Sequence, residues 1–188
     1  MNIKSIVEVL LFASATPLTN KKFIQVMSGY EVQHLKFYID ELNIDYNNQK
    51  KGLVIKNIAG GYQILALPKY HHLVAKLFDK NKKLSLSKAS LEALSIIAYK
   101  QPVSKADLES IRGVECASVI NTLVERGLIT VKGRANTPGR PLLFATTQQF
   151  LLFFGLDKLS DLPKLKEISE LINSNSNPYL FENLYEDK

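Results

Sequence analysis

In the first half of the chain, hydrophobic residues recur at helical spacing and are separated by polar breaks. This spacing near the amino terminus predicts one buried helical face, formed by Ile3, Ile6, Val7, Leu10 and Leu11. Pro17 interrupts the pattern, and Thr19 is placed to cap a short second helix that ends near Gly29. A third helix is predicted from the hydrophobic positions Val32, Leu35, Ile39 and Leu42.

Two β-prone runs follow the third predicted helix. Residues 53–58 and 62–67 are rich in branched aliphatic residues, and Gly60 and Gly61 lie between them. Because glycine tolerates the positive φ angles of a tight turn, the two runs are expected to pair as a hairpin. Three helices followed by a hairpin is the element order of a winged helix.

The second half of the chain repeats this order with different residues. A helix is predicted around residues 90–99, and it ends before Pro102. Ser104 and Asp107 have the spacing of a capping box, which predicts the start of a short second helix. A third helix stops at Gly127, and its hydrophobic face consists of Cys116, Ile120, Leu123 and Val124.

Two further strands and a closing helix complete the second copy. Residues 128–131 and 142–145 are the predicted wing strands, and a longer loop rich in Gly, Arg and Pro separates them. Residues 146–149 are expected to cap a helix that continues through residues 151–154.

The two halves align over one segment that contains both prolines. Residues 11–19 match residues 96–104 at an offset of 85, with proline on proline and Thr19 on Ser104. This match indicates a tandem repeat. The predicted fold class is therefore mainly α with small β-hairpin wings (α+β), arranged as two tandem winged-helix domains.

The charge distribution places a domain boundary near residue 84. The 188 residues include 24 basic and 18 acidic side chains, a formal net charge of +6. Residues 1–86 carry 12 basic and 6 acidic side chains, residues 87–155 carry 8 and 5, and residues 156–188 carry 4 and 7. The change coincides with a polar run at residues 80–87, as expected for a linker between compact units.

The end of the chain is distinct from both repeats. Residues 173–177 contain too little apolar surface to offset the entropy of ordering, so a loose tail is expected there. Residues 179–187 are acidic and aromatic, and either a docking peptide or a frayed tail fits them. The expected parts are a first winged-helix domain at 1–80, a linker at 81–88, a second domain at 89–163, and a helical extension with an acidic tail at 164–188.

The composition limits the compartment. Cys116 is the single cysteine, which excludes an internal disulfide and a zinc site with several cysteines, and fits a reducing cytoplasm. No run approaches the roughly 18–20 uninterrupted apolar residues that cross a bilayer. The sequence therefore predicts a soluble cytoplasmic protein without membrane contact.

Each candidate for catalysis has a structural explanation. Cys116 lies on a predicted hydrophobic helix face, where a buried thiol is expected rather than a nucleophile. His71 and His72 are adjacent, so on a helix they point about 100° apart and cannot share one metal ion. Gly60 and Gly61 lack the surroundings of a phosphate-binding loop. No catalytic residue, metal or cofactor is predicted, and the chain is not expected to be an enzyme.

Two classes of binding protein remain. The basic net charge and the winged-helix order fit a DNA-binding transcriptional regulator, whose third helix enters the major groove. The third helix of the second repeat opens near Glu115 and apolar residues, which suit neither phosphates nor base edges. Basic residues gather instead in the second wing at Lys132, Arg134 and Arg140, where nonspecific contact with DNA remains an alternative.

The first helix of each repeat has more apolar surface than a three-helix domain can bury. Val9 and Phe12 lie off the main hydrophobic stripe of the first helix, and the helix at 89–99 is apolar over most of its circumference. Surplus apolar surface indicates a partner. Three alternatives remain: burial of the two domains against each other, pairing of subunits, and a bound partner.

An ordered set of short motifs runs through the second half. They are Leu91-Glu-Ala-Leu-Ser-Ile-Ile-Ala-Tyr-Lys-Gln-Pro102, Ile111-Arg-Gly-Val114, Leu123-Val-Glu-Arg-Gly-Leu-Ile129, Gly133-Arg134, Thr137-Pro-Gly-Arg-Pro-Leu-Leu-Phe144, Thr146-Thr147 and Phe150-Leu-Leu-Phe-Phe-Gly-Leu156. The set closely resembles the segregation and condensation protein B family (ScpB). The resemblance is dense over residues 88–163 and more diffuse over residues 1–80.

The resemblance implies a non-catalytic accessory subunit of the bacterial condensin-like SMC–kleisin complex. By this resemblance, the protein is a homodimer paired through its amino-terminal domain, and it binds an ScpA-like kleisin largely through its carboxy-terminal domain. The kleisin in turn bridges the heads of the SMC ATPase, and the complex condenses and segregates chromosomes. A cytoplasmic, nucleoid-associated protein is implied, with DNA contact at most indirect or nonspecific.

The resemblance also directs the choice of site residues. Val9 and Phe12 are the predicted dimer interface, because their apolar side chains lie off the core stripe. The predicted kleisin contacts are polar or amphipathic residues within the matched motifs, namely Tyr99, Arg112, Arg134 and Arg140. Hydrogen bonding within the domain is the alternative for each of these four.

Overall fold

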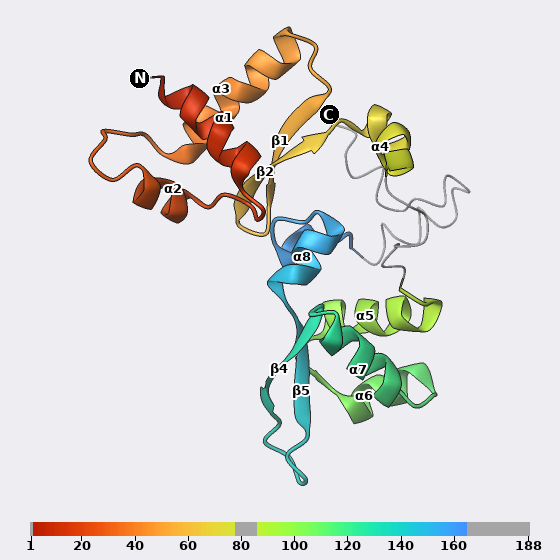
Figure 1. Ribbon diagram of the computed structural model, residues 1–188. Coiled ribbons are helices and arrows are strands. Elements are labelled where there is room, and N and C mark those ends of the chain that lie inside the picture. The colour runs from red at the N-terminus through yellow and green to blue at the C-terminus, as the bar shows by residue number, and fades with distance from the viewer. Residues whose placement is uncertain (1, 78–85, 165–188) are drawn as a thin grey trace. The chain divides into compact units, whose positions relative to one another are not determined.

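The computed structural model describes residues 2–77 and 86–164, which belong to two compact units (Figure 1). Unit 1 contains the residues up to 80 and those from 155 onward, and unit 2 contains residues 81–154. Each unit has three helices followed by an antiparallel hairpin, which confirms the predicted fold class. Most of the predicted linker and the acidic tail from residue 165 lie outside the described residues.

Unit 1 opens with α1 (Ile3–Ala13), α2 (Asn20–Val26) and α3 (Leu35–Asn48). The hairpin strands β1 (Leu53–Ile58) and β2 (Gly61–Ala66) follow, and then η1 (Pro68–Tyr70) and α4 (His71–Leu77). The short helix η3 (Leu159–Asp161) completes the described part of the unit.

The core of unit 1 is built from the predicted hydrophobic stripes. Buried side chains from the three helices and the first strand meet there: Val7, Leu11, Leu18, Phe23, Met27, Leu35, Tyr38, Ile39, Leu42, Tyr46 and Ile55. Thr19 caps α2 as predicted, since its Oγ1 accepts a hydrogen bond from the Lys22 N–H at 3.2 Å. Val32 packs against this core but precedes α3, because His34 is the N-cap and the helix begins at Leu35.

The hairpin turn of unit 1 differs by one residue from the predicted glycine pair. Ala59 and Gly60 have positive φ angles of +51° and +77°, whereas Gly61 already pairs with Ile58 in the strand. Gly61 is needed for a close approach instead, because a Cβ atom there would lie 2.9 Å from the backbone carbonyl carbon of Pro17.

The segment after residue 154 contacts this hairpin. The Ala59 N–H donates to the carbonyl of Leu156, and the Gly60 N–H donates to Oδ1 of Asp157, both at 2.9 Å. Leu156 is itself buried. These contacts group residues 155–164 with unit 1, whereas the sequence-based boundary at residue 163 assigned most of them to the second domain.

Unit 2 contains α5 (Lys88–Lys100), β3 (Val103–Ser104), α6 (Lys105–Arg112), α7 (Ala117–Glu125), β4 (Ile129–Arg134), β5 (Leu142–Thr146) and α8 (Gln148–Phe154). Its sheet has the antiparallel order β3-β5-β4. The far part of the β4–β5 hairpin extends beyond α6 and α7, as a wing does (Figure 1).

The predicted capping box at the start of α6 is confirmed. The Ser104 N–H and hydroxyl donate to Oδ2 of Asp107 at 3.2 and 2.6 Å, and the Asp107 N–H donates to the Ser104 Oγ at 3.2 Å. These bonds hold the pKa of the Asp107 carboxyl below its ordinary value, because they favour the charged form. Gly113, with φ +72°, ends the helix.

The hydrophobic face of α7 is narrower than predicted. Ile120 and Leu123 are buried, and Cys116 is fully buried as the N-cap residue. Val124, which was expected on the same face, is 43% exposed. Successive residues on a helix are separated by about 100°, so Val124 points away from the core that Leu123 enters.

In both units, the segment after the first helix pairs with a strand of the hairpin. Leu18 forms a β-bridge with Tyr62, and Val103 pairs with Phe144 in the same way. The first helices, however, do not follow the offset of 85. Because α1 ends five residues before Leu18 and α5 ends three residues before Val103, the helices align at an offset of 87.

Burial supports the offset of 87. This offset aligns Val7 with Leu94 and Leu11 with Ala98. All four of these residues are buried. The offset of 85 would instead align Phe12, which is 87% exposed, with the fully buried Ile97. The first repeat therefore has two extra residues between its first helix and the bridging residue.

Candidate protein-interaction sites

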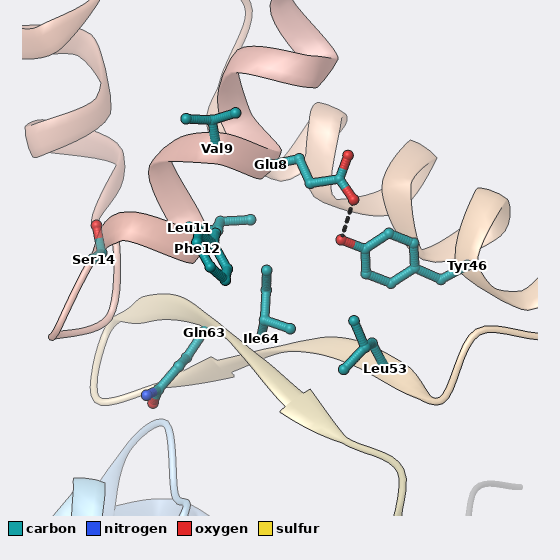
Figure 2. A pocket seen from close by; sticks show the side chains of 9 residues that line it. All are labelled: Glu8, Val9, Leu11, Phe12, Ser14, Tyr46, Leu53, Gln63 and Ile64. Atoms are coloured by element: carbon teal, nitrogen blue, oxygen red, sulfur yellow. Dashed lines mark hydrogen bonds between the residues drawn. The ribbon is translucent and has the colours of Figure 1, made fainter.

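The predicted dimer residues Val9 and Phe12 line an apolar groove on unit 1 (Figure 2). The groove has a volume of about 640 Å³ and lies between α1, α3 and the hairpin. Phe12 is 87% exposed, far more than an aromatic side chain inside a core. The lining residues are Glu8, Val9, Leu11, Phe12, Ser14, Tyr46, Leu53, Gln63 and Ile64.

One end of the groove is polar. The Tyr46 hydroxyl donates to Oε1 of Glu8 at 2.7 Å, and Nζ of Lys51 lies 3.7 Å from the same oxygen. Burial, reinforced by Glu8, raises the pKa of Tyr46 well above its ordinary value, so the phenol stays a hydrogen-bond donor. The groove therefore offers an apolar floor with a charge-balanced carboxylate at one end.

Five of the groove residues are not indicated as a site by the sequence: Ser14, Tyr46, Leu53, Gln63 and Ile64. Tyr46 continues the hydrophobic spacing of α3, which signals burial but not a groove. Leu53 and Ile64 rise from the hairpin toward α1 in Figure 2. The groove exists only because three segments distant in sequence pack together.

In unit 2, exposed apolar surface lies on α5. Leu91 is 42% exposed and Tyr99 is 36% exposed, and Ser95 lies between them on the same helix face. The opposite face is buried through Ala93, Leu94, Ile97 and Ala98. The structure thus places Tyr99 beside apolar surface, at the position in unit 2 that Phe12 occupies in unit 1.

Arg112 is enclosed within unit 2. Its side chain is 5% exposed, and Nη2 and Nε donate to Oε2 of Glu92 at 3.0 and 3.3 Å. Nη1 donates to Sγ of Cys116 at 3.2 Å. The bonds to Cys116 and Glu92 raise the pKa of the guanidinium and link three helices. Arg112 thus makes hydrogen bonds within the domain, which is the alternative to partner contact that the sequence left open.

Arg134 and Arg140 lie together on the wing. Nη1 of Arg134 donates to the carbonyl of Arg140 at 3.1 Å, and the Arg140 N–H donates to the carbonyl of Thr137 at 2.9 Å. Both arginines are exposed, as is Lys132. Of the four predicted kleisin contacts, the structure brings these two together and places Arg112 and Tyr99 on other elements.

The described residues contain neither a metal-ligand cluster nor a membrane-spanning helix. Across residues 2–77 and 86–164, no group of three or more His, Cys, Asp and Glu side chains is arranged to hold a metal ion. None of the helices in that part of the chain is long and apolar enough to cross a membrane.

The two repeats define a tandem winged-helix protein that presents exposed apolar helix surface in both units and a basic wing in unit 2. A family model described as segregation and condensation complex subunit ScpB matches residues 5–165. The chain belongs to this family, which confirms the resemblance seen in its motifs. It is therefore an accessory subunit of the SMC-complex class.

Individual relatives agree over most of the chain. Segregation and condensation protein B of Alkaliphilus metalliredigens is 40% identical over 168 residues, which cover 89% of this chain and 88% of the relative. The protein of the same name from Symbiobacterium thermophilum is 44% identical over 163 residues, covering 87% and 74%. A crystal structure of ScpB from Mycobacterium tuberculosis is 28% identical and covers 82% of this chain and 95% of that one, with a TM-score of 0.39.

Proposed function

We propose that this protein is a non-catalytic accessory subunit of a bacterial SMC–kleisin complex, which binds the kleisin and acts in chromosome condensation and segregation during cell division. Membership of the ScpB family carries the proposal. Exposed apolar helix surface in both units supports it, because an adaptor acts through surfaces that partners cover. Through this complex the protein would be cytoplasmic and associated with the nucleoid.

In this proposal, residues 1–80 form the dimerisation domain. A twofold interface is self-complementary, so the same patch of each copy faces the other. Phe12 lies at the rim of the groove and is largely exposed, and the groove beside it is mostly apolar. Phe12 of one copy would enter the groove of the second copy, with Val9 covered at the edge of the contact.

Residues 89–163 are proposed to bind the kleisin. The face of α5 formed by Leu91, Ser95 and Tyr99 would accept an apolar segment of that subunit, either helical or extended. Arg112 would act from behind this face by holding Glu92 in place. The kleisin would connect the protein to the SMC ATPase.

The alternative function, a sequence-reading transcriptional regulator, is less well supported by the start of α7. Oε1 of Glu109 accepts a hydrogen bond from the Cys116 N–H at 2.8 Å, and Glu115 precedes the same helix end. Lys105 lies 3.5 Å from the first carboxylate and 3.7 Å from the second. Two carboxylates and one lysine give the start of this helix a net negative charge. A recognition helix with such a charge at its start would repel the phosphates of DNA.

Co-expression with the kleisin tests this proposal. We expect the kleisin to co-purify with the wild-type chain, and the double substitution Leu91→Ala and Tyr99→Ala to reduce the recovered kleisin at least about tenfold, as loss of interface anchors does. Val124→Ala is the matched control, because Val124 is equally exposed in the same unit but lies on α7. Undiminished kleisin in the double variant would place the binding site elsewhere.

A further inference from the structure

The wing of unit 2 carries positive charge that no neighbouring carboxylate balances. Lys132, Arg134 and Arg140 are exposed, and none of the three forms an ion pair with a carboxylate in the described part of the chain. The sequence from Arg126 through Leu156 contains no Asp or Glu at all. The wing is therefore locally basic, beyond the general excess of +6 for the chain.

The loop that presents these side chains has a defined backbone. The Ala135 N–H donates to the carbonyl of Pro141 at 2.9 Å, and Arg134 and Thr137 both bond to the backbone of Arg140. Arg140 has a φ of +42°, a region that non-glycine residues adopt at a cost of about 1–3 kcal/mol. These hydrogen bonds fix the backbone of the loop that carries Arg134 and Arg140.

The chemistry of the wing tip favours phosphate over protein. Residues 136–139 are Asn, Thr, Pro and Gly, so the tip contains neither an aromatic nor a large aliphatic side chain. Protein interfaces are anchored most often by tryptophan, tyrosine and arginine, and the tip has neither of the two aromatic types. Phosphate contacts instead use arginine and lysine together with small polar side chains. The wing supplies the first kind through Lys132, Arg134 and Arg140, and its tip supplies the second through Asn136 and Thr137.

The first wing shows that this charge is not a property of the fold. Its turn consists of Ala59 and Gly60, and the Gly60 N–H is occupied by Asp157. Basic side chains are absent from that tip. The same hairpin in the same fold therefore forms without the arginines, and their presence in the second wing needs a separate explanation.

We propose that the wing of unit 2 binds the phosphate backbone of duplex DNA without reading its sequence. Lys132, Arg134 and Arg140 supply the cations, and the hairpin extends beyond α6 and α7, so it can reach a duplex while the acidic start of α7 stays away from the phosphates (Figure 1). This contact goes beyond the proposed kleisin binding and requires no kleisin. It would hold the assembly on DNA wherever the complex acts.

The test is fluorescence anisotropy of a labelled random-sequence duplex titrated with the full chain alone, at several salt concentrations. The test variant is Lys132→Gln with Arg140→Gln, because neither of these side chains makes a hydrogen bond within the described structure. We expect its affinity to fall about tenfold or more at about 50 mM salt, and the slope of log affinity against log salt to become shallower by about two.

The control variant is Lys21→Gln with Lys22→Gln, which changes the net charge equally but on the exposed surface of α2. It should bind within about twofold of wild type, and the conservative pair Lys132→Arg with Arg140→Lys should retain binding. Equal losses in the test and control variants would show general charge attraction and overturn the proposal. So would a wild-type chain without salt-dependent DNA binding, or one that prefers polyglutamate to the duplex.

Discussion

Units 1 and 2 share a scaffold but differ in what they expose. In both units the first helix is followed by a bridging residue, a capped second helix, a third helix and a hairpin. The wings differ most: the first closes with a two-residue turn against Asp157, whereas the second is long, exposed and basic. The shared features form the fold, so the differences are where the separate roles of the two units should lie.

The end of the first helix is an exception to this division. At the offset of 87, Phe12 and Tyr99 occupy the same position, and both are aromatic and solvent-exposed. A core would bury such side chains more completely, since Phe12 is 87% exposed and Tyr99 is 36% exposed. In the proposed function, this aromatic side chain would meet a second copy of the chain in unit 1 and the kleisin in unit 2.

The largest expected effect distinguishes the two possible alignments of the repeats. Ile97→Ala should lower the free energy of unfolding by about 2–5 kcal/mol, because the side chain is fully buried. Phe12→Ala, at the position that an offset of 85 would match to Ile97, should change it by less than about 0.5 kcal/mol. Urea unfolding at a concentration where the chain is monomeric measures the free energy of unfolding of both variants. Equal losses of stability in the two variants would favour the alignment of the repeats at an offset of 85.

The next prediction concerns self-association. Phe12→Ala should weaken the dimer at least about thirtyfold, which corresponds to the loss of about 2 kcal/mol that defines an interface hot spot. Ile44→Ala is the control, since Ile44 is 60% exposed on α3 of the same unit and does not line the groove. Sedimentation velocity over a dilution series gives both dissociation constants. A Phe12 variant as dimeric as wild type would exclude the groove as the interface.

The helix caps give a smaller difference between the units. Ser104→Ala should destabilise unit 2 by about 1–2 kcal/mol, because the buried hydroxyl takes part in a reciprocal capping box. Thr19→Ala should destabilise unit 1 by about 1 kcal/mol or less, since its cap is a single bond without a returning carboxylate. Thermal unfolding compares the two variants, and Ser104→Thr should recover most of the loss. A larger loss for Thr19→Ala would contradict this account.

The smallest effect is a dependence on pH at the same capping box. The pKa of Asp107 is lowered in the folded state, so its charged form stabilises unit 2 above the unfolded-state pKa of about 3.8. That stabilisation is lost as the pH falls through the lower folded-state value. The melting temperatures of wild type and Asp107→Asn should therefore differ at pH 7 and converge as the pH falls through the folded-state pKa of Asp107, which lies below 3.8. Asp40→Asn, which removes an exposed aspartate of α3 outside the capping box, is the control variant.

Local spacing predicted most of the fold. The hydrophobic stripes gave the helices, and Thr19, Ser104 and Gly127 marked helix ends at the expected places. Predictions became less accurate where burial depends on packing rather than on sequence neighbours. Val124 follows Leu123 by one residue yet is exposed, and the first helices align at 87 because a loop differs by two residues.

The sequence likewise predicts some residues of the candidate sites, whereas others become visible only in the structure. Val9 and Phe12 could be chosen from the sequence because they lie off a helical stripe. The groove they line depends on Tyr46 and Ile64, which are far from them in sequence, so no local pattern predicts it. The motif around Arg112 indicates a polar contact, and only the structure shows that its guanidinium is enclosed with Glu92 and Cys116.

The most direct test of the proposed adaptor role is the mass and composition of the complex formed when the chain is co-expressed with the kleisin. Size-exclusion chromatography with multi-angle light scattering, followed by quantitative mass spectrometry of the peak, gives both. The account predicts one stable species with two copies of this chain for each kleisin. A monomeric chain that elutes without the kleisin would contradict it.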